Sequence, residues 1–221
     1  MALTIYGTAA SRAVRPLWVA AELALHFEHV AIPYLGGTTR TDAFLAINPN
    51  GHIPALDDDG VIVWESMACA LYLAQRFSTL GAADLWARSP AQLAAVLQWA
   101  FWTVTEVEKD ALVYLMHTRE MAPDRRKPAL AAEAARRLVK PLCVLEGQLQ
   151  AVGQRSADAG GKPLFLAGER FTVADVCVAS VLAWVADAHE LMAPLPHVTS
   201  WLQRCLERPG YCQVNSWAKS G

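Results

Sequence analysis

The sequence lacks the features that place a protein in a membrane or on nucleic acid. No apolar run is long enough for a membrane-spanning helix, because charged residues or proline interrupt each one. The start of the chain, MALTIYGTAASRAVRP, has no basic segment followed by an apolar one, so we do not expect a signal peptide. Lysine and arginine total 19 against 21 aspartate and glutamate residues, without the basic excess typical of nucleic-acid binding. We therefore expect a cytoplasmic protein with no membrane or nucleic-acid partner.

The cysteines of this sequence do not form the spacing patterns of a disulfide framework or a zinc site. The five cysteines are an odd number, they are widely spaced, and none forms a CxxC pair. This spacing argues against a disulfide framework and against a zinc site. We expect reduced thiols that mostly pack as small hydrophobic side chains. Metal-binding and nucleotide-binding motifs are missing as well, so we expect neither kind of cofactor.

The residues that are present favour a folded protein with a sizeable core. The chain has 221 residues, of which 54% are hydrophobic and 18% are charged. This length suffices for one large domain or two small ones, and the composition is not that of a disordered chain.

The first 78 residues alternate between short strands and helices. The pattern predicts a strand, a helix and a second strand, then a hairpin and a further helix. The predicted segments are strands at 3–6, 27–33, 53–56 and 61–64, with helices starting at residues 11 and 65 and a short helix within 41–46. This βαβ–ββα order is that of a thioredoxin-like domain.

The rest of the chain is predicted to be helical. Residues 79–90 break the pattern and are interpreted as a linker, and residues 91–221 as an all-α domain. The predicted helices span 91–115, 129–152, 173–185 and 197–207, the last ending at Arg208-Pro209-Gly210. We expect an interruption or kink at Pro141, a polar loop at 154–162 and at most one short strand, at 165–166.

The turn from Gly7 to Arg12 lies between the first strand and the first helix. Free backbone N–H groups and the positive end of the helix dipole meet at such a turn and favour an anion such as a thiolate. Thioredoxin-like oxidoreductases have CxxC here, but this turn has no cysteine, so the thiol would come from a ligand. Ser11 would donate its O–H to that sulfur. The alternative is that Ser11 only caps the helix.

Two further segments suit a peptide ligand. Asn48-Pro49-Asn50-Gly51 is a dense turn signal, and the Ile53-Pro54 bond after it is a candidate cis peptide that would turn the Ile53 backbone toward a ligand. His52 would lie near a ligand carboxylate. The alternatives are a trans turn and a solvated histidine.

Glu65-Ser66 opens a helix directly after a strand. The Ser66 N–H and hydroxyl would bind a carboxylate, and Glu65 would bind an ammonium group, as a γ-glutamyl group requires. Ordinary helix capping is the alternative.

Two features of the helical part favour structural roles. Thr172 and Asp175 have the spacing of a capping box that starts the core helix. An aromatic-rich helix runs from Gln98 to Tyr114 and includes Trp102. It would line an apolar substrate pocket, although core packing or a dimer contact is the alternative.

Five stretches, in order and at matching spacing, resemble the cytosolic glutathione S-transferase family: SRAVRPLW, NPNGHIPAL, WESMACALYL, FTVADVCVA and PHVTSWLQRCLERPGY. The resemblance is nearest to bacterial serine-type members and in part to the zeta class. It implies a homodimeric detoxification enzyme in which a thioredoxin-like domain binds glutathione and an all-helical domain lines the site of a small apolar electrophile.

The resemblance also implies roles for individual residues. Ser11 would activate the glutathione sulfur. The Ile53 backbone beside cis-Pro54 would hold the cysteinyl part, and His52 would lie near the glycyl carboxylate. Glu65 and Ser66 would hold the γ-glutamyl end. The implied substrate-pocket residues are Arg15, Trp102 and Tyr114, and a surface ion pair is the alternative for Arg15.

The first turn departs from the family pattern. Zeta-like enzymes have Ser-Ser-Cys there, where this sequence has Ala10-Ser11-Arg12. An alignment with theta-like members selects Thr8 as the activating hydroxyl instead of Ser11.

Three functions stay open on this scaffold. One is glutathione transfer, and the second is a glutathione-dependent isomerase or peroxidase. The third is a non-catalytic interaction module, for which the alanine at position 10 leaves some room. The intact Ile53-Pro54 and Glu65-Ser66 pairs favour ligand binding and therefore the first two.

Overall fold

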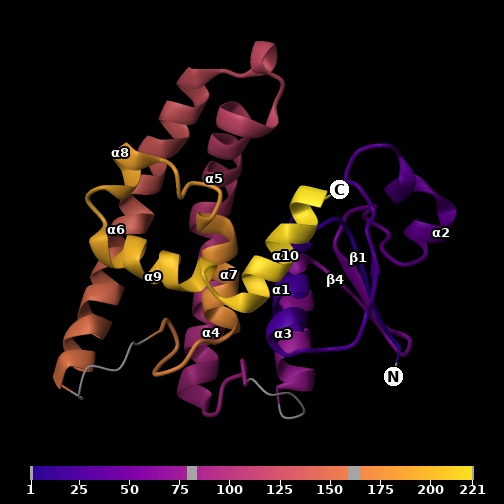
Figure 1. Cartoon of the computed structure of the whole chain (residues 1–221), viewed down its shortest axis with the longest axis horizontal. Coiled ribbons are helices and arrows are strands. Elements are labelled where there is room, and N and C mark those ends of the chain that lie inside the picture. Colours follow the sequence, from indigo (N-terminus) through magenta and orange to yellow (C-terminus); the bar gives the residue numbers. More distant parts are fainter. Residues whose placement is uncertain (1, 79–83, 159–164, 221) are drawn as a thin grey trace. The chain divides into compact units, whose positions relative to one another are not determined.

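The computed structural model describes residues 2–78, 84–158 and 165–220. They form two compact units (Figure 1). The first contains residues 1–86 and 207–221, and the second contains residues 87–206.

The first unit is built on a four-stranded mixed sheet. Its strands are β1 (Leu3–Tyr6), β2 (Glu28–Val30), β3 (Ala55–Asp58) and β4 (Val61–Trp64). Their order is β2-β1-β3-β4; β1 is parallel to β2, and the other pairs are antiparallel. The predicted thioredoxin-like domain is therefore confirmed.

The β3–β4 hairpin follows from its turn residues. Asp59 and Gly60 both have positive φ, 51° and 91°, which is the backbone conformation of a two-residue hairpin turn. The Gly60 N–H also donates to the Asp57 carboxylate at 2.7 Å. The turn fixes the register in which Ala55 faces Trp64 and Asp58 faces Val61.

Four α-helices belong to the first unit: α1 (Val14–Glu22), α2 (Asp42–Leu45), α3 (Ser66–Phe77) and α10 (Pro209–Ser220). A 3-10 turn at Thr38–Arg40 precedes α2. Helix α1 contacts both α3 and α10. Its Leu17 and Trp18 are fully buried, as the apolar pattern from residue 11 onward predicted.

Helix α10 was not predicted, because Arg208-Pro209-Gly210 was interpreted as a terminator. Pro209 instead occupies the first position of a new helix, where its missing N–H costs nothing. The sequence placed residues 207–221 in the helical domain, but they pack with the first unit. Figure 1 shows α10 in yellow beside α1.

An ion pair and an aromatic contact hold α10 on α1. The Arg208 guanidinium forms a bidentate contact with the Glu22 carboxylate, with Nε–Oε1 at 3.0 Å and Nη2–Oε2 at 2.6 Å. The Trp18 indole N–H donates to the same carboxylate at 3.0 Å, and the Trp18 and Tyr211 rings lie 4.7 Å apart. A Cβ at Gly210 would lie 2.8 Å from the Glu22 side chain, so glycine permits this close approach.

The predicted linker is partly integrated into the first unit. Residues 79–83 lie outside the described residues. Leu85 is buried, and its N–H donates to the Ser78 hydroxyl at 3.0 Å. The first unit therefore extends to Trp86, beyond the predicted boundary at residue 78.

Apart from one isolated bridge between Phe165 and Gly168, the regular secondary structure of the described residues in the second unit is helical. The helices are α4 (Pro90–Trp102), α5 (Glu108–Leu115), α6 (Pro128–Asp158), α7 (Val173–Leu182), α8 (His189–Met192) and α9 (Pro196–Leu206). π-helical turns at Thr103–Val107 and Met116–Glu120 flank α5, and a 3-10 turn spans Pro123–Arg125. The predicted all-helical domain is confirmed, although the short α8 was missed.

Helix α6 is longer than predicted. It passes through Pro141 to Asp158 without the expected interruption. Leu138, Leu142 and Leu145 are fully buried on both sides of Pro141, and this packing stabilises the helix across the proline. The polar loop predicted at 154–162 is helical up to residue 158, and residues 159–162 lie outside the described residues.

Helix α7 is the buried core helix that the sequence predicted, and all ten of its residues are buried. The predicted capping box is present, with Thr172 accepting from the Ala174 N–H and Asp175 accepting from the Thr172 N–H. Asp175 also accepts from the Leu166 N–H at 3.1 Å and from the Trp201 indole at 2.9 Å. Burial raises the pKa of Asp175, while these hydrogen bonds act in the opposite direction.

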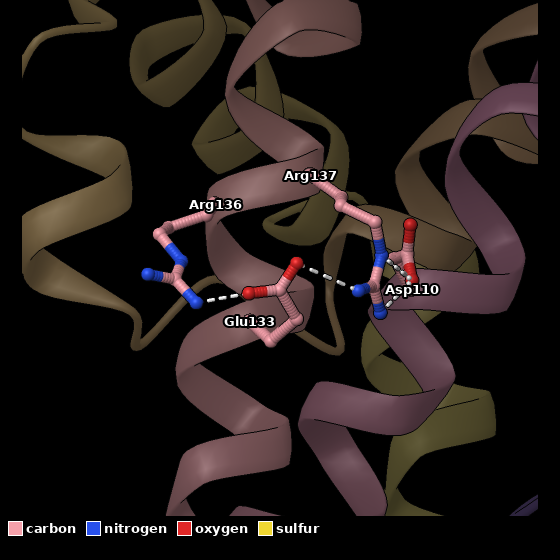
Figure 2. Close-up of polar contacts among 4 residues, drawn as sticks. All are labelled: Asp110, Glu133, Arg136 and Arg137. Atoms are coloured by element: carbon pink, nitrogen blue, oxygen red, sulfur yellow. Dashed lines mark hydrogen bonds and ion pairs between the residues drawn. The ribbon is translucent and has the colours of Figure 1, made fainter.

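An exposed ion-pair network joins α5 to α6 (Figure 2). Arg137 of α6 binds the Asp110 carboxylate of α5 through Nε at 2.9 Å and Nη2 at 2.8 Å. Glu133, one turn earlier on α6, lies between Arg136 and Arg137 and binds both. The hydrogen bond that Arg137 donates to Asp110 raises the pKa of Arg137.

Candidate functional site

The first candidate element is the turn between β1 and α1. Gly7 has φ 127°, and a Cβ there would lie 3.0 Å from the Cβ atoms of Ala13 and Ile53. Only glycine permits this backbone conformation and this approach together. Gly7 therefore lies where the turn meets the Ile53-Pro54 segment, so the structure brings two of the predicted binding segments together.

The Ser11 hydroxyl has two hydrogen bonds within the turn. Its Oγ donates to the Thr8 carbonyl at 2.7 Å and accepts from the Ala13 N–H at 3.1 Å. Ser11 is not the N-cap of α1, which is Ala13 and has no side-chain cap bond; its hydroxyl instead closes the turn before the helix. Because a hydroxyl has one proton, Ser11 would have to give up its bond to Thr8 before it donated to a ligand.

The same turn has polar groups without partners. Among the described residues, the Thr8 hydroxyl and the N–H groups of Ala9, Ala10 and Ser11 have no hydrogen-bond partner. Thr8 is half-buried, and its own N–H donates to the Ile32 carbonyl at 2.9 Å. The turn thus offers three N–H donors and one hydroxyl to an anion, as the strand-to-helix junction predicted.

The second candidate element is the segment that leads into β3. The Ile53-Pro54 peptide is cis, as the sequence comparison with the family implied. The Asn48 side chain is buried and shapes this segment, donating to the His52 carbonyl at 2.6 Å and accepting from the Asn50 N–H at 3.1 Å. Neither backbone polar group of Ile53 has a partner among the described residues, so both are open to an extended ligand.

A cation that the sequence analysis missed lies at this segment. Arg40 donates from Nη1 to the Asn50 carbonyl at 3.3 Å, and a Cβ at Gly51 would lie 2.7 Å from the same nitrogen. His52 follows in the chain and is exposed. Arg40 lies ten residues before Asn50 in the sequence, and only folding brings its guanidinium to this segment.

The third candidate element is the junction between β4 and α3. Glu65 has φ 72°, an uncommon value for a residue other than glycine, and its side chain does not cap the helix. Its carboxylate is exposed and has no partner among the described residues. Ser66 is buried, and its Oγ accepts from Arg15 Nη1 at 2.6 Å. The alternative that the Glu65 side chain caps the helix is therefore not supported.

Arg15, one of the implied substrate-pocket residues, belongs to the first unit. Its side chain is 1% exposed, and it lies on α1 against the first residue of α3. The structure therefore places Arg15 beside the predicted γ-glutamyl position.

Trp102 and Tyr114 belong to the second unit. The Trp102 ring packs edge-on against the Trp99 ring at 5.0 Å. Tyr114 is half-buried, and its pKa is raised by burial and by the charge of Asp187, while Arg119 opposes the rise. Arg119 itself binds Asp187 at 3.0 Å and the Trp184 carbonyl at 3.0 Å. Tyr114 thus lies within a charged group of residues.

The described residues form neither a metal site nor a disulfide. No group of three or more His, Cys, Asp or Glu side chains there is arranged to hold a metal ion. None of the five cysteines is in a disulfide, and Cys69, Cys177 and Cys205 are buried. Burial raises the pKa of Cys69 to about 12. No described helix combines the length and the apolar character needed to cross a membrane.

Comparison with protein families gives two matches that agree with the two units. The family model of the glutathione S-transferase N-terminal domain matches residues 1–75, and that of the glutathione S-transferase C-terminal domain matches residues 93–209.

Individual relatives and structures extend over nearly the whole chain. Glutathione S-transferase GstB of Escherichia coli is 28% identical over 218 residues, covering 96% of this chain and 97% of its own. The structure of glutathione transferase F7 from Populus trichocarpa has a TM-score of 0.84 at 24% identity, covering 98% and 99% of the two chains. A glutathione S-transferase-I bound with lactoylglutathione has a TM-score of 0.83 at 22% identity, covering 98% and 100%. Elongation factor 1-gamma of Equus caballus is 28% identical over 82% of this chain but only 38% of its own.

Proposed function

The chain belongs to the glutathione S-transferase family, and from this premise we propose that it binds glutathione and transfers it, as a thiolate, to a small apolar electrophile. The observation that supports binding most directly is the set of open polar groups on the first unit. The Ile53 backbone, the Glu65 carboxylate and the N–H groups of the first turn all lack partners among the described residues.

Glutathione has an amino-acid end, a central cysteinyl residue and a glycyl carboxylate, and each meets suitable groups. Glu65 pairs with the γ-glutamyl ammonium. The Ser66 N–H at the start of α3 and the Ser66 hydroxyl bind the γ-glutamyl carboxylate, since a helix N-terminus favours an anion. Arg15 holds the Ser66 hydroxyl and adds positive charge on that side.

The central part of glutathione lies along the segment before β3. Its cysteinyl backbone pairs with the N–H and C=O of Ile53, as an added strand would. The glycyl carboxylate lies near His52, where Arg40 supplies the cation that a carboxylate favours.

The glutathione sulfur then faces the turn between β1 and α1. One hydroxyl of this turn stabilises the thiolate. Ser11 is the residue that the family resemblance selected first. Thr8 is the stronger candidate on geometry, because its hydroxyl is uncommitted while the Ser11 proton is donated to the Thr8 carbonyl.

The reaction follows from a stabilised thiolate. The thiol loses its proton to solvent, and the sulfur lone pair forms a bond to an electrophilic carbon. A leaving group departs with its bonding pair, or the pair moves onto an activated multiple bond that solvent then protonates. Each hydrogen bond to the charged sulfur lowers its pKa and raises the thiolate fraction at neutral pH.

Two alternative functions are possible on this fold. The first uses the same glutathione site, and the second does not need it. An isomerase or peroxidase would use the same thiolate with a different second substrate. A non-catalytic module, as elongation factor 1-gamma suggests for part of this fold, would not need the open Ile53 backbone or the unpaired Glu65 carboxylate. Those two features favour glutathione binding.

The test is glutathione binding by calorimetry and retention on immobilised glutathione. Wild-type protein should bind, Glu65→Gln should weaken binding about 10-fold through loss of a charged hydrogen bond, and Glu28→Gln, an exposed control, should not. Conjugation of a chromogenic aryl halide then separates transfer from binding alone. If wild-type protein does not bind glutathione, the proposed function is wrong.

A further inference from the structure

The peptide group between Gly7 and Thr8 is held at both of its polar atoms. Its N–H, that of Thr8, donates to the Ile32 carbonyl at 2.9 Å. Its C=O, that of Gly7, accepts from His29 Nε2 at 2.9 Å. Because a peptide group is planar, two bonds at opposite ends fix the orientation of the whole plane.

The orientation of this plane sets the geometry of the first turn. Thr8 is the next residue, so its Cα and side chain leave directly from the held peptide. The Thr8 carbonyl in turn accepts the bond from the Ser11 hydroxyl at 2.7 Å. Both hydroxyls that are candidates for thiol activation therefore depend on the Gly7–Thr8 plane.

His29 is itself held in place by the C-terminal helix. Its ring lies 5.7 Å from the Trp217 ring of α10, at an interplanar angle of 37°. Trp217 also packs edge-on against Phe27 at 6.4 Å. A carbonyl oxygen can only accept, so His29 Nε2 bears the proton that it donates to Gly7. Strand β2 and α10 together thus support one carbonyl at the edge of the turn.

We propose that His29 is a positioning residue for the thiol-activating turn, and that Trp217 of α10 holds His29 in the orientation that this requires. The inference rests on the proposed function. It adds that residues 207–221, which the sequence placed outside the glutathione-binding domain, contribute to the activation of glutathione. His29 itself does not contact the ligand in this proposal; it acts through the Gly7 carbonyl.

The test compares His29→Leu with His29→Gln and His26→Leu. The glutamine amide has a donor at a reach similar to that of Nε2, so it should keep the bond to Gly7. His26, two residues before β2, is exposed and provides the same substitution without the bond. The readouts are the pKa of the thiol of bound glutathione, followed by thiolate absorbance, and the pH profile of conjugation.

We expect His29→Leu to lower kcat/KM near neutral pH by about 3- to 10-fold, the effect of losing one hydrogen bond, and to shift the thiol pKa upward. His29→Gln should remain near wild type, and His26→Leu should match it. Trp217→Ala should shift the thiol pKa in the same direction as His29→Leu, but by less. Circular dichroism and the thermal midpoint identify any variant that fails to fold.

Two outcomes overturn the inference. One is a folded His29→Leu variant with the wild-type thiol pKa and pH profile. The other is a His29→Gln variant as impaired as His29→Leu, because it would show that the ring and not the donor matters. If wild-type protein does not bind glutathione at all, the proposed function fails first, and the two failures are therefore distinguishable.

Discussion

Arg15 Nη1 donates to Ser66 Oγ at 2.6 Å across 51 residues of sequence. This bond joins the first turn of α1 to the start of α3, and both side chains are buried. A buried guanidinium requires hydrogen-bond partners, so the two residues support each other. The pair connects the helix that follows the first turn to the position proposed for the γ-glutamyl carboxylate.

The first prediction concerns this pair. Arg15→Leu should weaken glutathione binding by about 10-fold or more, because Ser66 loses its partner and the site loses a charge. Arg15→Lys keeps the charge and one donor and should lose less. Calorimetry gives the affinity, and the thermal midpoint shows whether folding is affected. Equal affinity in a folded Arg15→Leu variant would contradict a role for Arg15 in this site.

The second prediction separates the two hydroxyls of the first turn. Thr8→Val should raise the pKa of bound glutathione by about one to two units, since a hydrogen bond to a charged acceptor is lost. Ser11→Ala should mainly reduce stability, by about 1 kcal/mol, because the hydrogen bonds of its hydroxyl within the turn are lost. The measurement is the pH–rate profile of each variant. The opposite result, a shifted profile in Ser11→Ala and an unchanged one in Thr8→Val, assigns activation to Ser11.

The third prediction concerns pH and the start of α9. Glu146 accepts from the backbone N–H groups of His197 at 3.1 Å and Val198 at 2.8 Å. Burial raises the pKa of Glu146, but these bonds and the His197 side chain outweigh it, so the pKa is lowered overall from 4.5. A lowered pKa stabilises the folded state above pH 4.5, and this stabilisation is lost as the pH falls through the folded-state value.

Glu146→Gln should therefore be less stable than wild type near pH 7, by about 1 kcal/mol, and the difference should shrink in acid. Denaturant unfolding at several pH values measures it. Glu120→Gln, at an exposed position on a different segment, is the control. A difference that stays constant down to pH 3 would count against Glu146 as the titrating cap.

The fourth prediction concerns assembly. Strand β4 is at the edge of the sheet, and its Val61, Ile62 and Trp64 are 50%, 39% and 40% exposed. An apolar edge strand favours a partner surface, and we propose a homodimer that covers it. Light scattering should give twice the monomer mass at micromolar concentration, and Val61→Ser with Trp64→Ser should shift the protein toward monomer. Tyr34→Ser with Leu35→Ser, at positions that are more exposed but lie in a loop, should leave the mass unchanged. A wild-type monomer would refute the proposal.

Several elements were predictable because their signals are local. Strand β4 was predicted with the observed bounds, since an apolar run follows a turn of aspartates and glycine. The capping box at Thr172 and Asp175 needs only spacing, and it is present. The roles of Ser11, His52, Ile53, Glu65 and Ser66 in binding glutathione stay predictions.

The errors have a common cause. Pro141 and Pro209 were both interpreted as helix breakers, but one lies inside a helix and the other starts one. A proline costs about 3 kcal/mol inside a helix and almost nothing at its first position, but the local sequence does not say which of the two settings applies. The burial of Leu138 and Leu142 beside Pro141, and the contact of α10 with α1, decide the outcome through packing.

The sequence by itself determined the two-part architecture, the open turn after β1 and the segments that suit a peptide ligand. Those features depend on periodicity and on turn residues that lie close together in the chain. Only the tertiary structure decided that Arg15 holds Ser66, that Arg40 lies against Asn50 and Gly51, and that His29 donates to Gly7. Each of these bonds joins side chains to groups on other segments, and their distance depends on how those segments pack, which local sequence does not encode.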